Sequence, residues 1–147
     1  MYKDFATTII TGKSRTGKTE FIKNYIKELL REDVLIYLVD FKSYELYDFK
    51  NYDNVIYISE FGQFNDDLLF QILFDNHNIR KYIFVDEYEP IIYNKLIHSK
   101  ISILLNNNSN NINLVLSSRL EDIFPDNFKE KTKTIIHFNK DKRRTYE

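Results

Sequence analysis

Cysteine is absent from this chain of 147 residues, which excludes disulfide scaffolds, thiol nucleophiles and zinc sites with cysteine ligands. No apolar run approaches the roughly 18 residues of a membrane-spanning helix, so we expect no membrane segment. The first residues also lack the pattern of a signal peptide and start directly as a strand-like segment. Together these absences predict a cytoplasmic protein.

Glycine is scarce as well, because the chain contains three where average usage gives about ten. Two of the three, Gly12 and Gly17, lie five residues apart. An excess of one charge sign is missing too, since 21 Lys and Arg residues oppose 22 Asp and Glu residues for a net charge of -1. The total charge therefore does not indicate a nucleic-acid partner, and any basic surface must be local.

Length and composition indicate one globular domain over residues 1–147, with 43% hydrophobic and 29% charged residues. Six apolar runs, most of them continuous as expected for strands covered on both faces, predict strands. The runs are Ala6–Thr11, Val34–Val39, Val55–Ile58, Tyr82–Val85, Ile112–Ser117 and Thr134–Phe138. Amphipathic patterns predict helices over Lys18–Arg31, Phe64–Phe74 and Ile91–Leu105. This alternation predicts an α/β fold, a three-layer α/β/α sandwich with a mainly parallel central sheet.

Three local signals mark helix starts, turns and ends in this pattern. Pro90 is expected to open the third helix, because proline fits the first helical position. The polar run Asn106–Asn113 predicts a surface turn before a buried strand. The basic segment Asn139–Glu147 predicts a solvated terminus.

Residues 12–19 (GKSRTGKT) match the phosphate-loop pattern G-x-x-x-x-G-K-[ST]. An apolar strand precedes the match and an amphipathic helix follows it, which is the context that such a loop requires. The glycines let successive backbone N–H groups point at phosphates, and the positive end of the helix dipole points at the same anion. All eight residues are therefore expected to bind nucleotide: Gly12, Lys13, Ser14, Arg15, Thr16, Gly17, Lys18 and Thr19. Lys18 should bridge the β- and γ-phosphates, and the Thr19 hydroxyl should ligate Mg²⁺.

Two acids follow the apolar run Tyr82–Val85 directly. In this nucleotide-binding class an aspartate at the end of a strand holds Mg²⁺ through water, so Asp86 is the second metal candidate. An adjacent acid can orient and deprotonate the attacking water, which makes Glu87 the candidate catalytic base. Glu89 is a weaker alternative for that role.

Ser118 and Arg119 follow the buried run Ile112–Ser117. Polar residues at the end of this strand are expected to lie beside the γ-phosphate. Either residue then senses the γ-phosphate or positions water, and Arg119 joins Lys18 and Glu87 as a catalytic candidate. The alternative for Arg119 is an ordinary surface arginine after a strand.

With these motifs in place, the sequence resembles the FtsK/HerA family of ring-forming, DNA-pumping ATPases. The segments that carry the resemblance are Val34–Phe49, Tyr82–Glu87, Ile112–Arg119 and Thr132–Thr145. In the first segment, Asp40 and Lys42 match the family's Asp-Pro-Lys, and Phe41 replaces the proline. Glu45 and Leu46 match the Glu-Leu that follows it in the family.

The resemblance implies a P-loop NTPase with a RecA/FtsK-like sheet, using ATP and Mg²⁺ as cofactors. It implies a homo-oligomeric ring, with a hexamer as the usual form, that translocates or packages double-stranded DNA. It also implies an arginine from a neighbouring subunit in each site, for which Arg80, Arg143 and Arg144 are candidates. Arg119 stands where the family usually has glutamine. The short chain resembles a minimal motor core such as viral packaging ATPases, which would place it in the host cytoplasm.

Two other functions stay open on the sequence alone. A small P-loop kinase would need an arginine-rich lid and an acceptor pocket. A switch NTPase would need Asn-Lys-x-Asp, which Asn139–Asp141 approaches without the spacer residue. A nucleotide-binding accessory subunit would need a partner chain for work on DNA, and the short length is compatible with that role.

Overall fold

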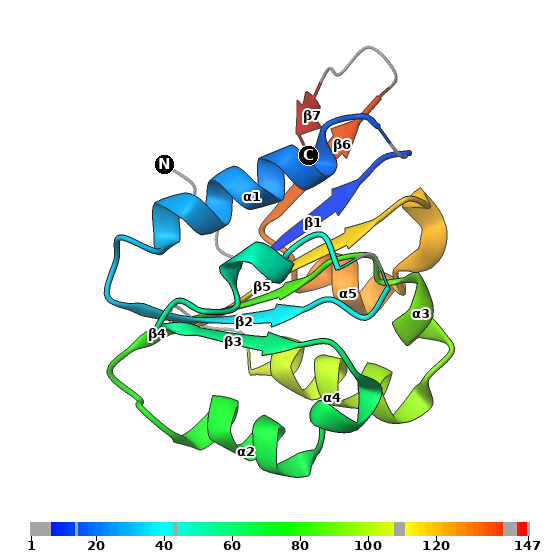
Figure 1. Ribbon diagram of the computed structural model, residues 1–147. Helices are drawn as coiled ribbons and strands as arrows, with labels where there is room; N and C mark the ends of the chain where they lie inside the picture. Colours follow the sequence, from blue (N-terminus) through cyan, green and yellow to red (C-terminus); the bar gives the residue numbers. More distant parts are fainter. Residues whose placement is uncertain (1–6, 14, 43, 108–110, 140–143, 147) are drawn as a thin grey trace.

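The computed structural model describes residues 7–13, 15–42, 44–107, 111–139 and 144–146. In these residues seven strands form one sheet in the order β3-β2-β4-β5-β1-β6-β7 (Figure 1). The strands are β1 Thr8–Thr11, β2 Val34–Val39, β3 Val55–Ile58, β4 Arg80–Val85, β5 Ile112–Ser118, β6 Thr134–Phe138 and β7 Arg144–Tyr146. The first six are parallel, and β7 pairs antiparallel with β6.

Helices cover both faces of this sheet (Figure 1). They are α1 Lys18–Leu29, α2 Asp66–Phe74, α3 Glu89–Ile92, α4 Lys95–Asn106 and α5 Asp126–Glu130. Helix α1 lies on one face, and α2, α4 and α5 lie on the other. The predicted three-layer α/β/α arrangement with a mainly parallel sheet is confirmed. The longest helices in the described ranges have 12 residues, too few to cross a bilayer, and no described helix qualifies as a membrane span.

Alternate residues of the central strands feed two separate cores. Ile83 and Val85 of β4 pack into the core under α2, α4 and α5. Tyr82 and Phe84 of the same strand pack into the core under α1, where Tyr25 meets both rings edge-on. Both faces of β4 are therefore buried, which explains why its sequence is continuously apolar rather than alternating.

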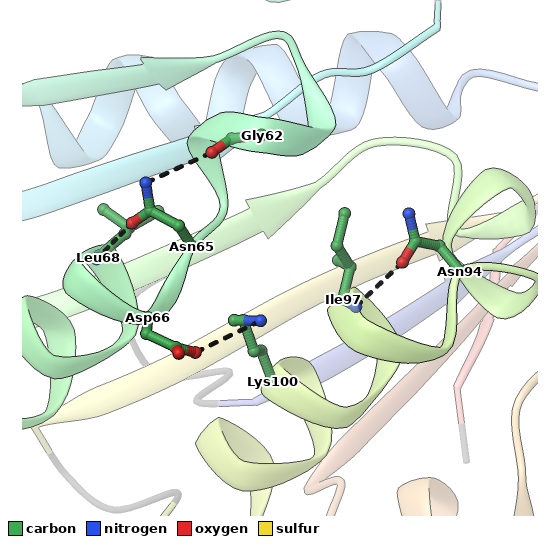
Figure 2. A network of polar contacts seen from close by, with 7 residues as sticks. All are labelled: Gly62, Asn65, Asp66, Leu68, Asn94, Ile97 and Lys100. Carbon is green, nitrogen blue, oxygen red and sulfur yellow. Dashed lines mark hydrogen bonds and ion pairs between the residues drawn. The ribbon is translucent and has the colours of Figure 1, made fainter.

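The single helix predicted over Ile91–Leu105 is wrong in one respect, because the chain forms two helices there. Helix α3 ends at Ile92, and Asn94 takes an extended conformation. The Asn94 side chain then accepts a hydrogen bond from the Ile97 N–H at 3.2 Å and caps α4 (Figure 2). A capping asparagine is more stable outside a helix than within one, so the helix breaks at this residue. Pro90 lies in the first turn of α3 rather than at the start of the longer helix.

Helices α2 and α4 lie beside each other on their face of the sheet (Figure 2). Asn65 caps α2 by accepting from the Leu68 N–H at 3.0 Å. Asp66 in the first turn of α2 pairs with Lys100 of α4 at 3.5 Å. This acidic residue also faces the positive end of the helix dipole, which favours it there.

The solvated terminus predicted for Asn139–Glu147 is also wrong in part. Residues 144–146 form β7, with Ile136 opposite Tyr146 and Phe138 opposite Arg144. The pairing gives β6 a hydrogen-bonding partner on its outer edge, which an edge strand otherwise lacks. The predicted tail residues 140–143 and 147 lie outside the described residues.

Candidate functional site

The candidate site lies at the carboxyl ends of three neighbouring strands. The loop after β1 contains the phosphate-loop motif, Asp86 and Glu87 follow β4, and Arg119 follows β5. Since β5 lies between β4 and β1 in the sheet, these segments meet at one edge. In open α/β sheets this edge is where ligands bind.

The two glycines of the loop hold backbone conformations that other residues rarely adopt. Gly12 has φ 149°, and a Cβ atom there would lie 2.6 Å from the Phe138 carbonyl oxygen. Gly17 has φ 103° and precedes the first residue of α1. Within the loop, the Thr16 hydroxyl donates to the Lys13 carbonyl at 2.6 Å. The loop is therefore folded back on itself and packs against Phe138 at the end of β6.

A hollow of about 540 Å³ brings most of the predicted site residues together, and its size suits a nucleotide-sized ligand. The residues that line it are Arg15, Gly17, Lys18, Thr19, Glu20, Lys23, Glu45, Asp86, Glu87 and Arg119. All three catalytic candidates and both metal candidates are among them. Ser14 lies outside the described residues.

A second hollow of about 400 Å³ borders the same loop. Gly12, Lys13, Thr16, Arg119, Leu120, Phe138 and Asn139 line it. Arg119 borders both hollows, so they adjoin each other at this residue. Sequence reasoning missed the last three of these residues, because no local motif marks where the ends of β5 and β6 meet.

Lys18 is buried at the start of α1, with 8% of its surface exposed. Its Nζ donates a hydrogen bond to the Ser118 carbonyl at 3.2 Å. Burial lowers the pKa of Lys18, and neighbouring carboxylates, with Glu89 the strongest, only partly offset this effect. A bound phosphate would supply the additional negative charge that favours the ammonium form.

Asp86 and Thr19 present oxygen atoms to the same hollow. Asp86 is 7% exposed, and its carboxylate accepts a hydrogen bond from the Ser117 hydroxyl at 3.2 Å. Mg²⁺ takes oxygen ligands and usually binds through one or two protein groups, with water and phosphate completing its shell. One hydroxyl and one carboxylate fit that requirement.

Glu87 has an unusual backbone conformation, with φ 60°. A non-glycine residue in this left-handed region is strained, and such strain gathers at functional sites. Its N–H donates to the Ser117 hydroxyl at 3.0 Å, which holds the turn. The turn directs the half-buried Glu87 into the hollow beside Asp86.

Glu89 is placed differently from the two acids before it. It is not among the residues that line either hollow. Its Oε1 atom accepts hydrogen bonds from the Ser118 hydroxyl and the Arg119 N–H, both at 2.6 Å. Glu89 therefore ties the start of α3 to the end of β5.

The Asp40 of the FtsK/HerA-like segment is fully buried and does not line the hollows. Its Oδ2 atom accepts from the Leu46 N–H at 3.0 Å and from the Tyr57 hydroxyl at 2.8 Å. Burial and this hydrogen bond raise the pKa of Tyr57. The loop that Asp40 shapes carries Glu45 into the larger hollow, where it pairs with Lys23 at 3.8 Å.

Three further arginines were candidates to act in a neighbouring subunit. Arg80 begins β4, at the opposite end of this strand from the site, and its guanidinium lies 5.4 Å from the Tyr82 ring centroid. The structure therefore does not bring Arg80 to the site that this chain forms. Arg143 lies outside the described residues, and Arg144 begins β7.

Comparison with protein-family models found no match, and comparison with curated proteins found none. Solved structures gave clear matches at low sequence identity. EssC (ATPases 2 and 3) from Geobacillus thermodenitrificans has a TM-score of 0.73 at 11% identity, over 93% of this chain and 32% of that one. The pCW3 conjugation coupling protein TcpA has a TM-score of 0.70 at 16% identity, and the match covers 90% of this chain and 48% of TcpA.

The genome packaging NTPase B204 from Sulfolobus turreted icosahedral virus 2, in complex with ATP-gammaS, has a TM-score of 0.66 at 20% identity. That match covers 94% of this chain and 76% of B204. This chain spans about a third of the matched EssC chain and about half of TcpA. EssC is described by its ATPases 2 and 3 and B204 as an NTPase, so the expected P-loop ATPase fold is confirmed.

Proposed function

We propose that this chain is a Mg²⁺-dependent ATPase of the FtsK/HerA type that moves or packages double-stranded DNA as a ring of identical subunits. The observation that carries the proposal is the convergence of the phosphate loop, Asp86, Glu87 and Arg119 on one hollow. The fold neighbours support ATP as the substrate, because B204 and TcpA are described with ATP analogues.

In this proposal the triphosphate binds to the N–H groups of the loop and to the first turn of α1. Lys18 leaves the Ser118 carbonyl and contacts the β- and γ-phosphates. The adenine base of ATP occupies the smaller hollow, where it contacts the apolar side chains of Leu120 and Phe138. Arg15 and Lys13, which are exposed on the loop, add positive charge near the phosphates.

The residues after β4 and β5 have separate roles in hydrolysis. Thr19 and Asp86 would hold Mg²⁺, which would supply positive charge beside the phosphates. Glu87 orients a water molecule and takes one of its protons as the water oxygen bonds to the γ-phosphorus. The bond from that phosphorus to the bridging oxygen breaks, which leaves ADP and phosphate, and Arg119 stabilises the charge on the transferring group.

The proposed action on DNA as a ring is supported by the fold neighbours and by the shape of the site. A conjugation coupling protein and a genome packaging NTPase are among the fold neighbours. The larger hollow is open and exposes Arg119, so there is room for an arginine of a second subunit. A net charge of -1 requires that each subunit grips DNA phosphates with few cations, and many subunits together then supply the affinity.

The test is an ATPase assay on the purified chain with Mg²⁺, with and without duplex DNA, together with the oligomeric mass in ATP. We expect duplex DNA to stimulate turnover and the stimulation to fall with salt, since phosphate contacts release counterions. Phosphate transfer to nucleoside monophosphates would instead indicate a kinase. ATP binding with no turnover, with or without DNA, would indicate an accessory subunit.

A further inference from the structure

Glu89 is half-buried where the start of α3 meets the end of β5, and the roles proposed above do not use it. Its Oε1 atom accepts two short hydrogen bonds, from the Ser118 hydroxyl and the Arg119 N–H. Its Oε2 atom is buried and makes no hydrogen bond among the described residues. A buried carboxylate oxygen without a hydrogen bond costs free energy, so Glu89 is not there to maximise stability.

Ser118 connects Glu89 to the phosphate loop. The fully buried Ser118 accepts hydrogen bonds at its carbonyl from the Gly12 N–H at 3.1 Å and from Lys18 Nζ at 3.2 Å. Its hydroxyl bonds both to Glu89 and to the backbone of Leu120. One residue therefore separates the Glu89 carboxylate from the lysine that is expected to contact the phosphates.

The two glutamates lie in different places around that lysine. Glu89 contacts the end of β5 and lines neither hollow. Glu87, in contrast, lines the larger hollow, where water and phosphate would meet. The two glutamates therefore face different groups, Glu87 the substrate space and Glu89 the protein.

We propose that Glu89 is a positioning residue for ATP hydrolysis: it fixes the end of β5, so that Arg119 points into the hollow and Ser118 holds Lys18 until a phosphate replaces it. This inference rests on the proposed ATPase function. In this role Glu89 is not the catalytic base, because it lines neither hollow and its Oε1 atom accepts from the Ser118 hydroxyl and the Arg119 N–H.

Two substitutions separate positioning from proton transfer. Glu89→Gln keeps an oxygen that accepts from Ser118 and Arg119, so we expect kcat within about threefold of wild type. Glu89→Ala removes the acceptor, and we expect kcat to fall between about ten- and a hundredfold with KM changed much less. Glu130→Ala, an exposed charge loss at the end of α5, is the matched control and should leave both constants unchanged.

A double-mutant cycle tests whether the effect passes through Arg119. If Glu89 acts by placing this arginine, Glu89→Ala should reduce kcat little further in an Arg119→Ala background. Melting temperatures of all variants are measured beside the rates, and kinetics are run well below the lowest of them. A purely structural role would lower the melting temperature of Glu89→Ala without lowering kcat, and that result would overturn the inference.

The remaining outcomes are equally decisive. Loss of turnover in Glu89→Gln as large as in Glu87→Gln would make Glu89 a base and contradict the positioning role. Full additivity with Arg119→Ala would contradict the route through Arg119. A wild-type chain that hydrolyses no ATP would overturn the proposed function and this inference together, whereas an active wild type with an equally active Glu89→Ala would overturn the inference alone.

Discussion

The ends of β2 and β4 have the same sequence pattern, a buried apolar strand followed by aspartate, yet the two aspartates serve different purposes. Asp40 after β2 is fully buried and holds the Leu46 N–H and the Tyr57 hydroxyl. Asp86 after β4 lines the hollow at the phosphate loop. The difference follows from position in the sheet, because β4 lies next to β5 and one strand from β1, whereas β2 lies beyond β4. A strand-end acid marks a site when its strand lies near the phosphate loop.

Both strand ends are also anchored by a tyrosine hydroxyl. At β2, Tyr57 of β3 donates to Asp40. At β4, Tyr88 shares a hydrogen bond of 2.7 Å with His98 Nδ1 of α4, and the His98 ring stacks on Phe128. The anchor at β2 uses the aspartate itself, whereas the anchor at β4 uses the residue after Glu87 and leaves Asp86 and Glu87 facing the hollow.

The largest expected effect concerns the acids after β4. Glu87→Gln should lower kcat by about 10²–10⁴-fold, because an amide does not accept the proton of the attacking water. Affinity for ATP and the melting temperature should stay near wild type. Titration with ATP and single-turnover kinetics measure the two quantities separately. Normal turnover in this variant would show that Glu87 is not the base.

Asp86→Asn should act on the metal rather than on the proton. We expect the Mg²⁺ concentration for half-maximal turnover to rise by about ten- to a hundredfold, with part of the rate recovered at high Mg²⁺. EDTA should abolish turnover in the wild type at the same time. An Asp86→Asn variant with an unchanged Mg²⁺ requirement would show that this aspartate does not serve the metal.

Asp40→Ala should affect stability instead of chemistry, which is the sharpest contrast between the two strand ends. It leaves the buried Leu46 N–H and the Tyr57 hydroxyl without their acceptor, so unfolding should become easier by about 1–3 kcal/mol. For a chain of this size the melting temperature should fall by roughly 3–12 °C. Turnover measured well below that temperature should change little. A large loss of kcat without a loss of stability would show that Asp40 serves the chemistry rather than the structure.

The smallest expected effect is a pH dependence confined to the anchor at β4. Burial lowers the pKa of His98 below its ordinary value of 6.5, so the folded state favours the neutral ring. As pH falls through 6.5, the unfolded chain binds a proton at His98 before the folded chain does. The free energy of unfolding therefore decreases below that pH. We expect a fall in melting temperature of less than about 3 °C between pH 7 and pH 5.5 from this group. His98→Gln should flatten that dependence, and Asp40→Ala should not.

Tyr88→Phe is the companion to that experiment, because it keeps the ring packing against Phe124 and Phe128 and removes the hydroxyl. It should lower the free energy of unfolding at pH 7 by about 1 kcal/mol, the contribution of one hydrogen bond.

The pH prediction itself is contradicted if His98→Gln leaves the pH dependence of the melting temperature unchanged, because another group would then titrate in this range.

The strands and the phosphate loop could be predicted because their signals are local. The central β4 is apolar on both faces, and the loop spacing from Gly12 to Thr19 specifies backbone geometry that few other structures need. The break before α4 also had a local signal in Asn94, but the apolar periodicity over Ile91–Leu105 outweighed it. Helix α5 and β7 were not predicted, because five and three residues carry too little periodic signal.

The parts of the site that escaped prediction depend on residues far apart in sequence. Glu89 acquires its partners from β5, about 30 residues away. The smaller hollow combines Leu120 with Phe138 and Asn139 from another strand. Asp40 was recognised in a family-like segment, but its purpose depends on Tyr57 of the neighbouring strand. Such pairings follow from the sheet order, which no single segment encodes.

The contact between Gly12 and Phe138 has a consequence for synthesis. The loop precedes β6 in the chain, yet its first glycine packs against the last residue of β6, and the Phe138 ring also lies 3.5 Å from where a Cβ of Gly17 would be. The ribosome adds that strand more than a hundred residues after the loop. A nascent chain that stops before β6 therefore has the motif but not its support, so the capacity to hold a nucleotide should arise late in translation.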